Sequence, residues 1–528
     1  MFHLVQRRLR KFFDKPDQIW LILLFLTAAM IRFYGIWFLR WGFDESNLYN
    51  GGSLLVKSLY KIITDLNSFQ YKTFVTIYGI TGKYLSAISV PIGYFVEQIF
   101  NIRLPIPLGL ILTRVLTSFI PNIVTMYFVY KIAKILSGSR VFVISSLVLF
   151  TFAFKHVETA HYAVPDSLTT MFTVICIYFL LLFRIIGFEK KYLIGGSVFA
   201  SFAASSKIHV GLILFATIFL MLLIDFGKHK YDRKLLWFFL KILFISFFVS
   251  FVIINLLYFI DVNWWVKLIY YHIVNYPFII RGTFLTYFYF SPPFGVGMGI
   301  VILTFAGIAV IFFHERKNHF LIPAIFCVLF YLFLSTTRGA IDRWIIPMIP
   351  IMILFAAAGI EVIYRTIAQK VNPQVASLLV GGILLLVVSR PIYNIILYDL
   401  NLVERPSTYE KIKEYVETQV DSSRCIGCYI GVGLDGVTTK LPNSIEELEK
   451  SNIEYAVFSD FWFFSRRFPK FLLNKDKLGP RRGGHWEPIR RHIETHWHLL
   501  KIFYPKYHTE WSPNIANQQV FYVYRKAS

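Results

Sequence analysis

Two neighbouring carboxylates, Asp44 and Glu45, follow directly on the first membrane-length apolar run of the chain, residues 19–39. About 20 apolar residues are enough to cross a bilayer as a helix. A carboxylate at this boundary can act as a general base toward a lipid-borne substrate, or it can end a helix and pair with Arg40. We favour catalysis, because a segment far too long for a mere connection, residues 40–108, follows the helix.

A second group of titratable side chains lies in the stretch KHVETAHYAVPDSL, between two apolar segments. Packing alone does not explain so many ionisable groups in one short turn: Lys155, His156, Glu158, His161 and Asp166. Asp166 follows Pro165 and precedes a helix, so it can cap that helix, take part in catalysis, or do both.

Cations interrupt the apolar segments at several points. Lys207 lies between two of them and fits either a snorkelling lysine or a ligand contact. Arg338 and Arg343 precede a Pro-rich helix, where they can anchor the interface or bind a lipid phosphate. Arg32 and Arg114 lie within apolar helices, which is costly unless each meets an acid or a cavity.

Composition sets the class of the protein. Of 528 residues, 56% are hydrophobic and 16% are charged, and the mean hydropathy is +0.57. A soluble core cannot hide that much apolar surface, so we expect a polytopic membrane protein. The net charge of +23 does not indicate nucleic-acid binding, because the basic residues are scattered in short loops between apolar segments.

We therefore expect a mostly α protein with about eleven transmembrane helices. Apolarity predicts these segments: 19–39, 109–132, 140–155, 166–186, 192–205, 208–226, 235–259, 294–313, 319–335, 344–364 and 374–396. Lys and Arg then collect on one face, which the positive-inside rule makes cytoplasmic together with the N-terminus. The acidic first loop lies on the opposite face. The sequence has no N-x-Ser/Thr acceptor, which favours a prokaryotic inner membrane.

The chain changes character after the last apolar segment. We divide it into a transmembrane domain, 1–396, and a small extracytoplasmic α/β domain, 397–528, where charges of both signs return. Ser407 and Glu410 predict a capping box at the start of a helix. Cys425 and Cys428 form a lone CxxC, which indicates a local disulfide or two free thiols rather than zinc.

Six motifs, in this order, give the chain its resemblance to a known family: GFDESNLY, IYGITGKYL, ILTRVLTSF, HYAVPDSLTTMF, FAASSKIHVGLIL and DRWIIPMIPIM. They resemble motifs of the GT-C superfamily of integral-membrane glycosyltransferases, and the resemblance covers roughly residues 18–360. The similar branch contains protein O-mannosyltransferases and the lipid A aminoarabinose transferase. One departure is Lys-Ile-His at Lys207, where many relatives have small or aromatic residues after the lysine.

The resemblance implies a transferase that moves a sugar from a polyprenyl-phosphate donor by an inverting displacement, with no nucleotide at the active site. Asp44 would be the base, and Glu45 and Asp166 would orient the acceptor or bind a cation; a divalent cation is left open. The implied contacts are Lys207, Arg338 and Arg343 for the donor phosphate, and His161, Glu158, Tyr78 and Arg114 for the substrate.

Two other functions fit parts of the sequence. A transporter or flippase of a phosphorylated lipid agrees with many helices and intramembrane arginines, but the chain has no inverted repeat. A polymerase or ligase of surface glycans differs from the favoured function only in its acceptor. Membrane lipids are expected partners, while the acceptor, the sugar and the oligomeric state are not readable from these motifs.

Overall fold

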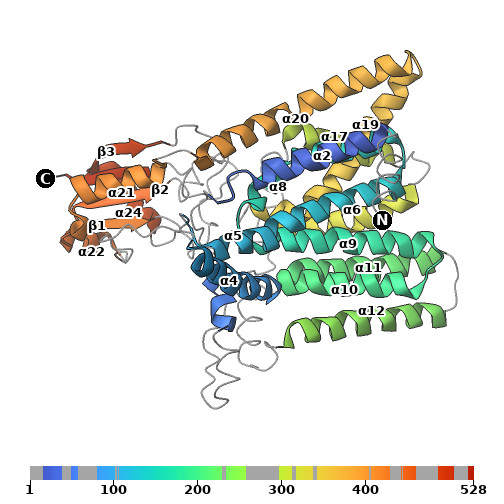
Figure 1. Cartoon of the computed structure of the whole chain (residues 1–528), viewed down its shortest axis with the longest axis horizontal. Coiled ribbons are helices and arrows are strands. Elements are labelled where there is room, and N and C mark those ends of the chain that lie inside the picture. The colour runs from blue at the N-terminus through green and yellow to red at the C-terminus, as the bar shows by residue number, and fades with distance from the viewer. Residues whose placement is uncertain are drawn as a thin grey trace.

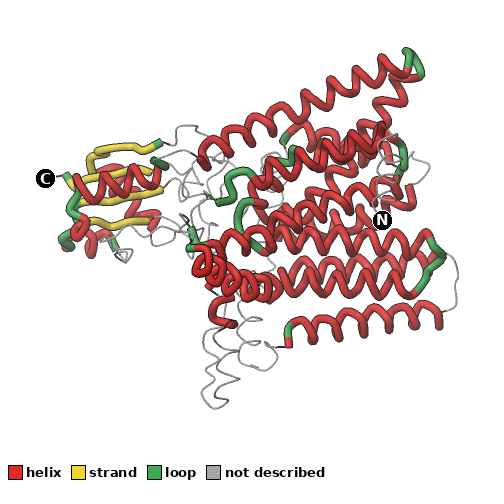
Figure 2. Tube along the Cα trace, viewed as in Figure 1, coloured by secondary structure: helices red, strands yellow, loops and turns green. Residues whose placement is uncertain are grey.

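The structure, a computed structural model, consists of a bundle of long helices and a small mixed sheet (Figure 2). It describes residues 16–37, 49–50, 52–56, 80–101, 104, 106–228, 233–256, 297–311, 317–336, 342–403, 406–428, 442, 444–459, 486–504 and 521–527.

The helices of the bundle run back and forth beside one another, as Figure 1 shows for α6, α9, α10, α11 and α12. In chain order the helices are α2 (Pro16–Phe33), α4 (Ile80–Phe100), α5 (Leu108–Arg114), η3 (Val115–Phe119), α6 (Ile120–Leu136), α7 (Arg140–Thr151), α8 (Phe154–Ala160), α9 (Pro165–Ile185), α10 (Lys190–Ser206), α11 (Ile208–Lys228), α12 (Arg233–Ile254), α17 (Met298–Ile311), η4 (Lys317–Phe320), α18 (Leu321–Thr336), η5 (Asp342–Met348), α19 (Ile349–Ala368) and α20 (Pro373–Val403).

The predicted membrane architecture is confirmed. Seven helices within the described residues are long and apolar enough to cross a membrane, or eight if the bent pair α7–α8 is one span. Two shorter apolar helices, α2 and α17, and the Ser-containing α10 match the remaining predicted segments. The chain is therefore a multi-pass integral membrane protein.

Two predicted segments have boundaries that differ from expectation, for local reasons. The segment predicted as 140–155 breaks after Thr151, and α8 continues at 53° to α7. The apolar run ends at Phe154, and the polar residues that follow form α8 in place of the expected turn. The segment predicted to begin at 344 starts as the 3₁₀ helix η5, since Pro347 and Pro350 interrupt the α-helical bonding there.

A π-helical turn, η3, interrupts the span from α5 to α6. Pro121 is the second residue of α6, just beyond this turn. A proline has no N–H to donate to the carbonyl four residues earlier. The π turn absorbs this mismatch without breaking the span. Arg114 directly precedes this turn, and Ser118 within it bonds the loop between α8 and α9.

Close helix contacts hold the bundle together. α17 and α19 approach so closely that a Cβ on Gly307 would lie 1.7 Å from the carbonyl oxygen of Phe355. Small residues at such crossings let membrane helices gain van der Waals contact that bulkier side chains would prevent. One continuous apolar core, from Ala28 to Val388, results from this packing.

We call the end of the bundle where α9 begins and α10 ends the site end, and the opposite end the far end. Polar contacts at the far end tie neighbouring helices together. Arg184 Nη2 donates to Asp225 Oδ1 at 2.8 Å, linking α9 to α11. Ser137 Oγ donates to Glu361 Oε1 at 2.8 Å, linking α6 to α19.

Beyond the site end lies a four-stranded sheet in the order β1-β2-β4-β3, near the end of α20 (Figure 1). Its strands are β1 (Cys425–Cys428), β2 (Tyr455–Ser459), β3 (Trp497–Phe503) and β4 (Phe521–Lys526). β1 and β2 are parallel, while β4 is antiparallel to both of its neighbours. The expected small α/β element is therefore present.

Helices cover both faces of this sheet. α21 (Thr408–Gln419) packs on one face through Ile412 and Val416. α22 (Ile445–Lys450) and α24 (Trp486–His496) pack on the other. The predicted capping box at the start of α21 is confirmed, because Ser407 Oγ accepts from the Glu410 amide and Glu410 Oε2 accepts from the Ser407 amide.

The CxxC motif lies on β1, where Cys425 is a buried free thiol. The alternative of a local disulfide with Cys428 is therefore wrong, and burial raises the pKa of the Cys425 thiol to about 12.

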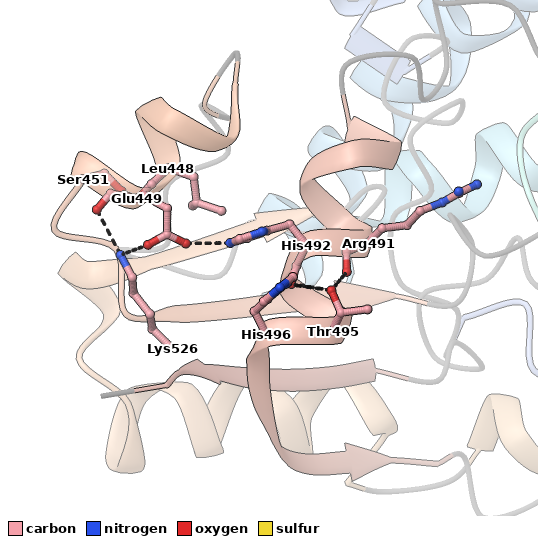
Figure 3. A network of polar contacts seen from close by, with 8 residues as sticks. All are labelled: Leu448, Glu449, Ser451, Arg491, His492, Thr495, His496 and Lys526. Carbon is pink, nitrogen blue, oxygen red and sulfur yellow. Dashed lines mark hydrogen bonds and ion pairs between the residues drawn. The ribbon is translucent and has the colours of Figure 1, made fainter.

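A polar network on the same domain joins α22 to α24 and β4 (Figure 3). His492 Nε2 lies 2.6 Å from Glu449 Oε1, and Lys526 Nζ lies 2.9 Å from Glu449 Oε2. Glu449 therefore accepts from two elements at once. These two hydrogen bonds, that of Lys526 first, lower the pKa of Glu449.

Candidate active site

Asp166 occupies the first turn of α9, at the site end of the bundle. Val164 is the N-cap residue, and no side chain caps this helix. The capping alternative for Asp166 therefore does not apply, although the helix N-terminus still favours a carboxylate there. The Asp166 side chain is 1% exposed, so its charge needs a partner within the protein.

Lys207 is that partner. It ends α10 with an extended backbone (φ −144°, ψ 107°), and α11 begins at the next residue. Its Nζ donates a hydrogen bond to Oδ1 of Asp166, and the Lys207 side chain is 9% exposed. Lys207 is thus half of a buried ion pair and does not snorkel toward water.

The second carboxylate oxygen of Asp166 has a different environment. Oδ2 is buried and has no hydrogen-bond partner. Buried polar atoms nearly always have a partner, so an exception needs an explanation. A carboxylate with one oxygen fixed by a cation and the other unbonded can accept a hydrogen bond from a substrate hydroxyl.

A chain of hydrogen bonds fixes the turn that carries Asp166. His156 Nδ1 lies 2.9 Å from Asn122 Oδ1, and Asn122 Nδ2 donates to Ser167 Oγ at 2.9 Å. Ser118 Oγ donates to the carbonyl of Tyr162 at 2.5 Å. These contacts join η3 and α6 to both sides of the loop at 161–164, so the orientation of α9 is set from neighbouring helices.

Glu158 points into the protein. Its Oε2 lies 2.5 Å from Nζ of Lys155 on the same short helix, and the two side chains are 0% and 1% exposed. The carboxylate and the ammonium neutralise each other within one turn of α8. Its predicted contact with substrate stays a prediction.

His161 and Arg114 both bind the backbone at the end of α2. His161 Nε2 lies 2.8 Å from the carbonyl oxygen of Tyr34, and Arg114 Nη1 donates to the carbonyl of Ile36 at 2.7 Å. Gly35, between them, has φ +77° and packs under Leu402 of α20. The predicted substrate contacts of both residues stay predictions, and the structure gives each a definite structural partner.

His161 and Arg114 thus hold the turn at 34–37, which precedes the acidic pair in the sequence. Arg32 supports it from the other side, since Nη2 donates to the carbonyl of Phe150 at 2.9 Å and Nη1 to that of Thr151 at 3.1 Å. These carbonyls lie in the last turn of α7, where carbonyls lack the regular partner of the helix interior. Arg32 is thus a buried cation that binds the C-terminal carbonyls of α7, whereas an acid or a cavity was expected as its partner.

Several predicted residues lie outside the described residues: Asp44, Glu45, Tyr78 and Arg338. Arg343 belongs to η5, whose backbone is described. η5 contacts α8 and α9, the helices on either side of the Asp166 turn. The structure therefore brings the element carrying Arg343 against the helices of the Asp166 turn.

Sequence reasoning missed two polar residues near this turn. Asp399 Oδ1 lies 3.9 Å from His161 Nε2, and Asn122 bridges His156 and Ser167. Both carry a readable signal, because each is a polar residue inside a long apolar helix. For Asp399 the signal was lost because the last apolar segment was expected to end at 396, whereas α20 continues to Val403.

The site was also tested for a cation. Within the part of the chain that the structure describes, no three His, Cys, Asp or Glu side chains gather in a way that could hold a metal ion. The described neighbour of Asp166 is itself a cation, Lys207.

Comparison with known proteins adds two findings. Residues 110–254 match the family model described as dolichyl-phosphate-mannose-protein mannosyltransferase, and this segment contains Arg114, Asp166 and Lys207. No curated protein sequence matches the chain.

Two solved structures share the fold over nearly the whole chain. One is ArnT from Cupriavidus metallidurans bound to undecaprenyl phosphate, with 12% identity, a TM-score of 0.51, and coverage of 95% of this chain and 97% of that one. The other is the apo oligosaccharyltransferase of Archaeoglobus fulgidus, with 12% identity, a TM-score of 0.53, and coverage of 94% and 74%. At this identity the likeness establishes the fold.

Proposed function

We propose that this chain, whose residues 110–254 match the mannosyltransferase model and whose fold is similar to that of ArnT, is a GT-C membrane glycosyltransferase. It would transfer a sugar from a polyprenyl-phosphate donor to an acceptor. The polyprenyl phosphate bound to ArnT supports the donor class, since the two chains share their fold along almost their full lengths. The acceptor is a hydroxyl of a lipid, a glycan or a protein.

The observation that carries this proposal is the ion pair of Asp166 and Lys207 at the site end, within the segment that matches the mannosyltransferase model. Oδ1 is fixed by Lys207, while Oδ2 is buried without a hydrogen-bond partner. Oδ2 would accept a hydrogen bond from the acceptor and so orient it for attack. A second carboxylate, Asp44, would remove the acceptor's proton as general base, with Glu45 beside it.

Cations are needed on the donor side, because the lipid phosphate gains negative charge as the anomeric carbon takes on oxocarbenium character. An ammonium carries three N–H donors, so Lys207 can bond to Asp166 and to a phosphate oxygen at the same time. Arg338 and Arg343 would hold the other phosphate oxygens. A direct displacement of this kind inverts the anomeric centre.

Charge distribution supports an orientation for the molecule. Lys and Arg gather in the loops at the far end, including 228–234, so we place that end in the cytoplasm. The site end and the domain at 397–528 then face outward. A prokaryotic inner membrane agrees with the lack of N-glycosylation acceptors.

The test is turnover by purified protein in detergent with a panel of labelled polyprenyl-phosphate sugars, read as release of polyprenyl phosphate. Asp166→Asn should strongly reduce release, while Asp225→Asn should retain it per folded molecule. Asp225 is a matched control, because it is also buried (4% exposed) and paired with a cation, Arg184, but at the far end. Donor binding without any release would overturn the proposal and favour a lipid transporter.

A further inference from the structure

The imidazole ring of His161 lies between the C-terminal ends of two helices. His161 is the C-cap residue of α8, and its Nδ1 lies 2.8 Å from the carbonyl oxygen of Val157, four residues earlier. Its Nε2 lies 2.8 Å from the carbonyl oxygen of Tyr34, which directly follows α2. Each ring nitrogen therefore faces a hydrogen-bond acceptor.

Two acceptors require two N–H donors. A neutral imidazole has one N–H and one lone pair, whereas the imidazolium ion has two N–H groups. In a neutral ring, one nitrogen lone pair would face a carbonyl oxygen at 2.8 Å with no proton between them. The geometry therefore favours a positively charged ring, which the carbonyls at a helix C-terminus also stabilise.

A positive charge on this ring also has costs. Burial lowers the pKa of His161, the two carbonyls raise it, and the charges of Arg32 and Arg114 lower it. The His161 side chain is 0% exposed, so water cannot stabilise the charge. The cation therefore needs an anion within the protein.

Asp399 of α20 is the acid opposite the ring. Its Oδ1 lies 3.9 Å from Nε2 of His161, and within the described part of the chain this oxygen is buried without a hydrogen-bond partner. The preceding residue, Tyr398, packs edge-on against the same ring, with 5.2 Å between the ring centroids. The acid on α8 itself, Glu158, is paired with Lys155. Asp399 is thus the acid placed to balance the charge of His161.

We propose that His161 and Asp399 form a buried imidazolium–carboxylate pair, and that Asp399 is a positioning residue for the Asp166 site, acting through His161. This role rests on the transfer reaction proposed above. The pair joins α20 to the ends of α2 and α8. His161 also begins the loop 161–164, which leads to Asp166 in the first turn of α9.

A neutral ring beside a carboxylic acid is the alternative arrangement of the same pair. It holds the same number of protons and the same net charge of zero, so burial alone does not choose between the two. The two carbonyl acceptors do choose, because only the imidazolium donates to both.

The protonation of the ring tests this proposal by solid-state NMR of the full chain in phospholipid vesicles at pH 7. Alanine labelled at its carbonyl carbon and fully labelled histidine single out His161, because Ala160–His161 is the only Ala-His pair in the sequence. Both ring nitrogens of His161 should carry a proton. Asp399→Asn should leave one of them without a proton, whereas Asp225→Asn, which changes a buried acid at the far end, should have no effect on the ring.

Turnover of the donor by the same variants tests the positioning role. Asp399→Asn should lower kcat by about 10–100-fold, since a small misplacement of a group at the site has an effect of this size. KM for the donor should stay unchanged, because Asp166 contacts the acceptor in the proposed reaction. Asp399→Glu should keep both ring protons and most of the turnover. Asparagine keeps the size of the side chain, so a role in packing alone predicts no change in either measurement.

The contrary results are distinguishable. A nitrogen without a proton on His161 of the parent, or two protonated nitrogens in Asp399→Asn, would overturn the ion pair. Normal kcat in an Asp399→Asn variant that has lost the ring proton would overturn the positioning role. A parent that binds donor without any turnover would overturn the proposed function instead, and the ring signals of the parent would still decide the ion pair.

Discussion

Asp166 and Lys207 are 41 residues apart in the chain and form a buried ion pair that joins the start of α9 to the end of α10. Both residues lie within the family-matched segment. Removing one partner of such a pair leaves a buried charge without compensation, whereas removing both leaves none. Experiments can therefore separate the contribution of the pair to stability from its contribution to catalysis.

Lys207→Met should destabilise the protein by about 3–5 kcal/mol, because the Asp166 carboxylate remains buried without its cation. The double variant Asp166→Asn/Lys207→Met should recover much of that loss while remaining inactive. Thermal unfolding in detergent, with turnover measured on the same samples, separates the two effects. Additive losses of stability would show that the two side chains do not interact as described.

Asp44→Asn should abolish transfer and leave a folded protein that still binds donor lipid. The amide keeps the size of the carboxylate but cannot take the acceptor's proton, and general-base assistance typically contributes ~10²–10⁴-fold. Glu45→Gln should be less harmful, and Asp166→Asn should fall between the two. Near-normal turnover of Asp44→Asn would move the base to another residue, and a misfolded variant would make Asp44 a structural partner.

Arg338→Ala and Arg343→Ala should each weaken use of the donor by about 1.5–3 kcal/mol, the range for a hydrogen bond to a charged group. The dependence of rate on donor concentration measures this loss. Lys370→Ala, an exposed cation between α19 and α20 at the far end, is the control and should have no effect. If all three variants behave alike, the two arginines are interfacial anchors.

A cysteine introduced in the segment 228–234 should react with a membrane-impermeant maleimide only from the cytoplasmic side, and one at Ser512 only from outside. The clustering of Lys and Arg at the far end is the reason. Intact cells and inverted vesicles give the two measurements. Labelling of position 512 from the cytoplasm would reverse the proposed orientation, and the Asp166 site would reverse with it.

Acid should loosen the contact between α22, α24 and β4. Lys526 and His492 hold the pKa of Glu449 below its ordinary value of 4.5. Because the folded-state pKa is the lower one, Glu449 stabilises the fold above pH 4.5 and loses this contribution as the pH falls below it. The effect should be small, since Glu449 is 41% exposed.

Thermal unfolding followed from pH 6 to pH 3 measures this contribution. Glu449→Gln should flatten the acid side of the profile, and Glu446→Gln, on the same helix, should leave it unchanged. Identical profiles for the parent and Glu449→Gln would show that the network in Figure 3 does not contribute to stability.

Apolarity in the sequence was enough to predict the long apolar helices, because a membrane span must be long and apolar wherever it packs. The capping box at Ser407 was equally readable, since its two hydrogen bonds join residues three apart. The resemblance read from the six motifs agrees with the family model that matches residues 110–254 and with the fold of the two solved structures. Each of these signals is local along the chain.

Tertiary structure alone decided which polar residues meet. Lys207 could be read as snorkelling and Asp166 as a cap, until α9 and α10 brought them together and left Oδ2 of Asp166 unbonded. His161, whose contact with substrate stays a prediction, bonds the carbonyl of Tyr34, 127 residues away. A single sequence does not show which distant residues pair, because a buried polar group can meet its need for a hydrogen-bond partner with any other buried polar group. The sequence therefore determined which residues needed partners, and helix packing determined which partners they found.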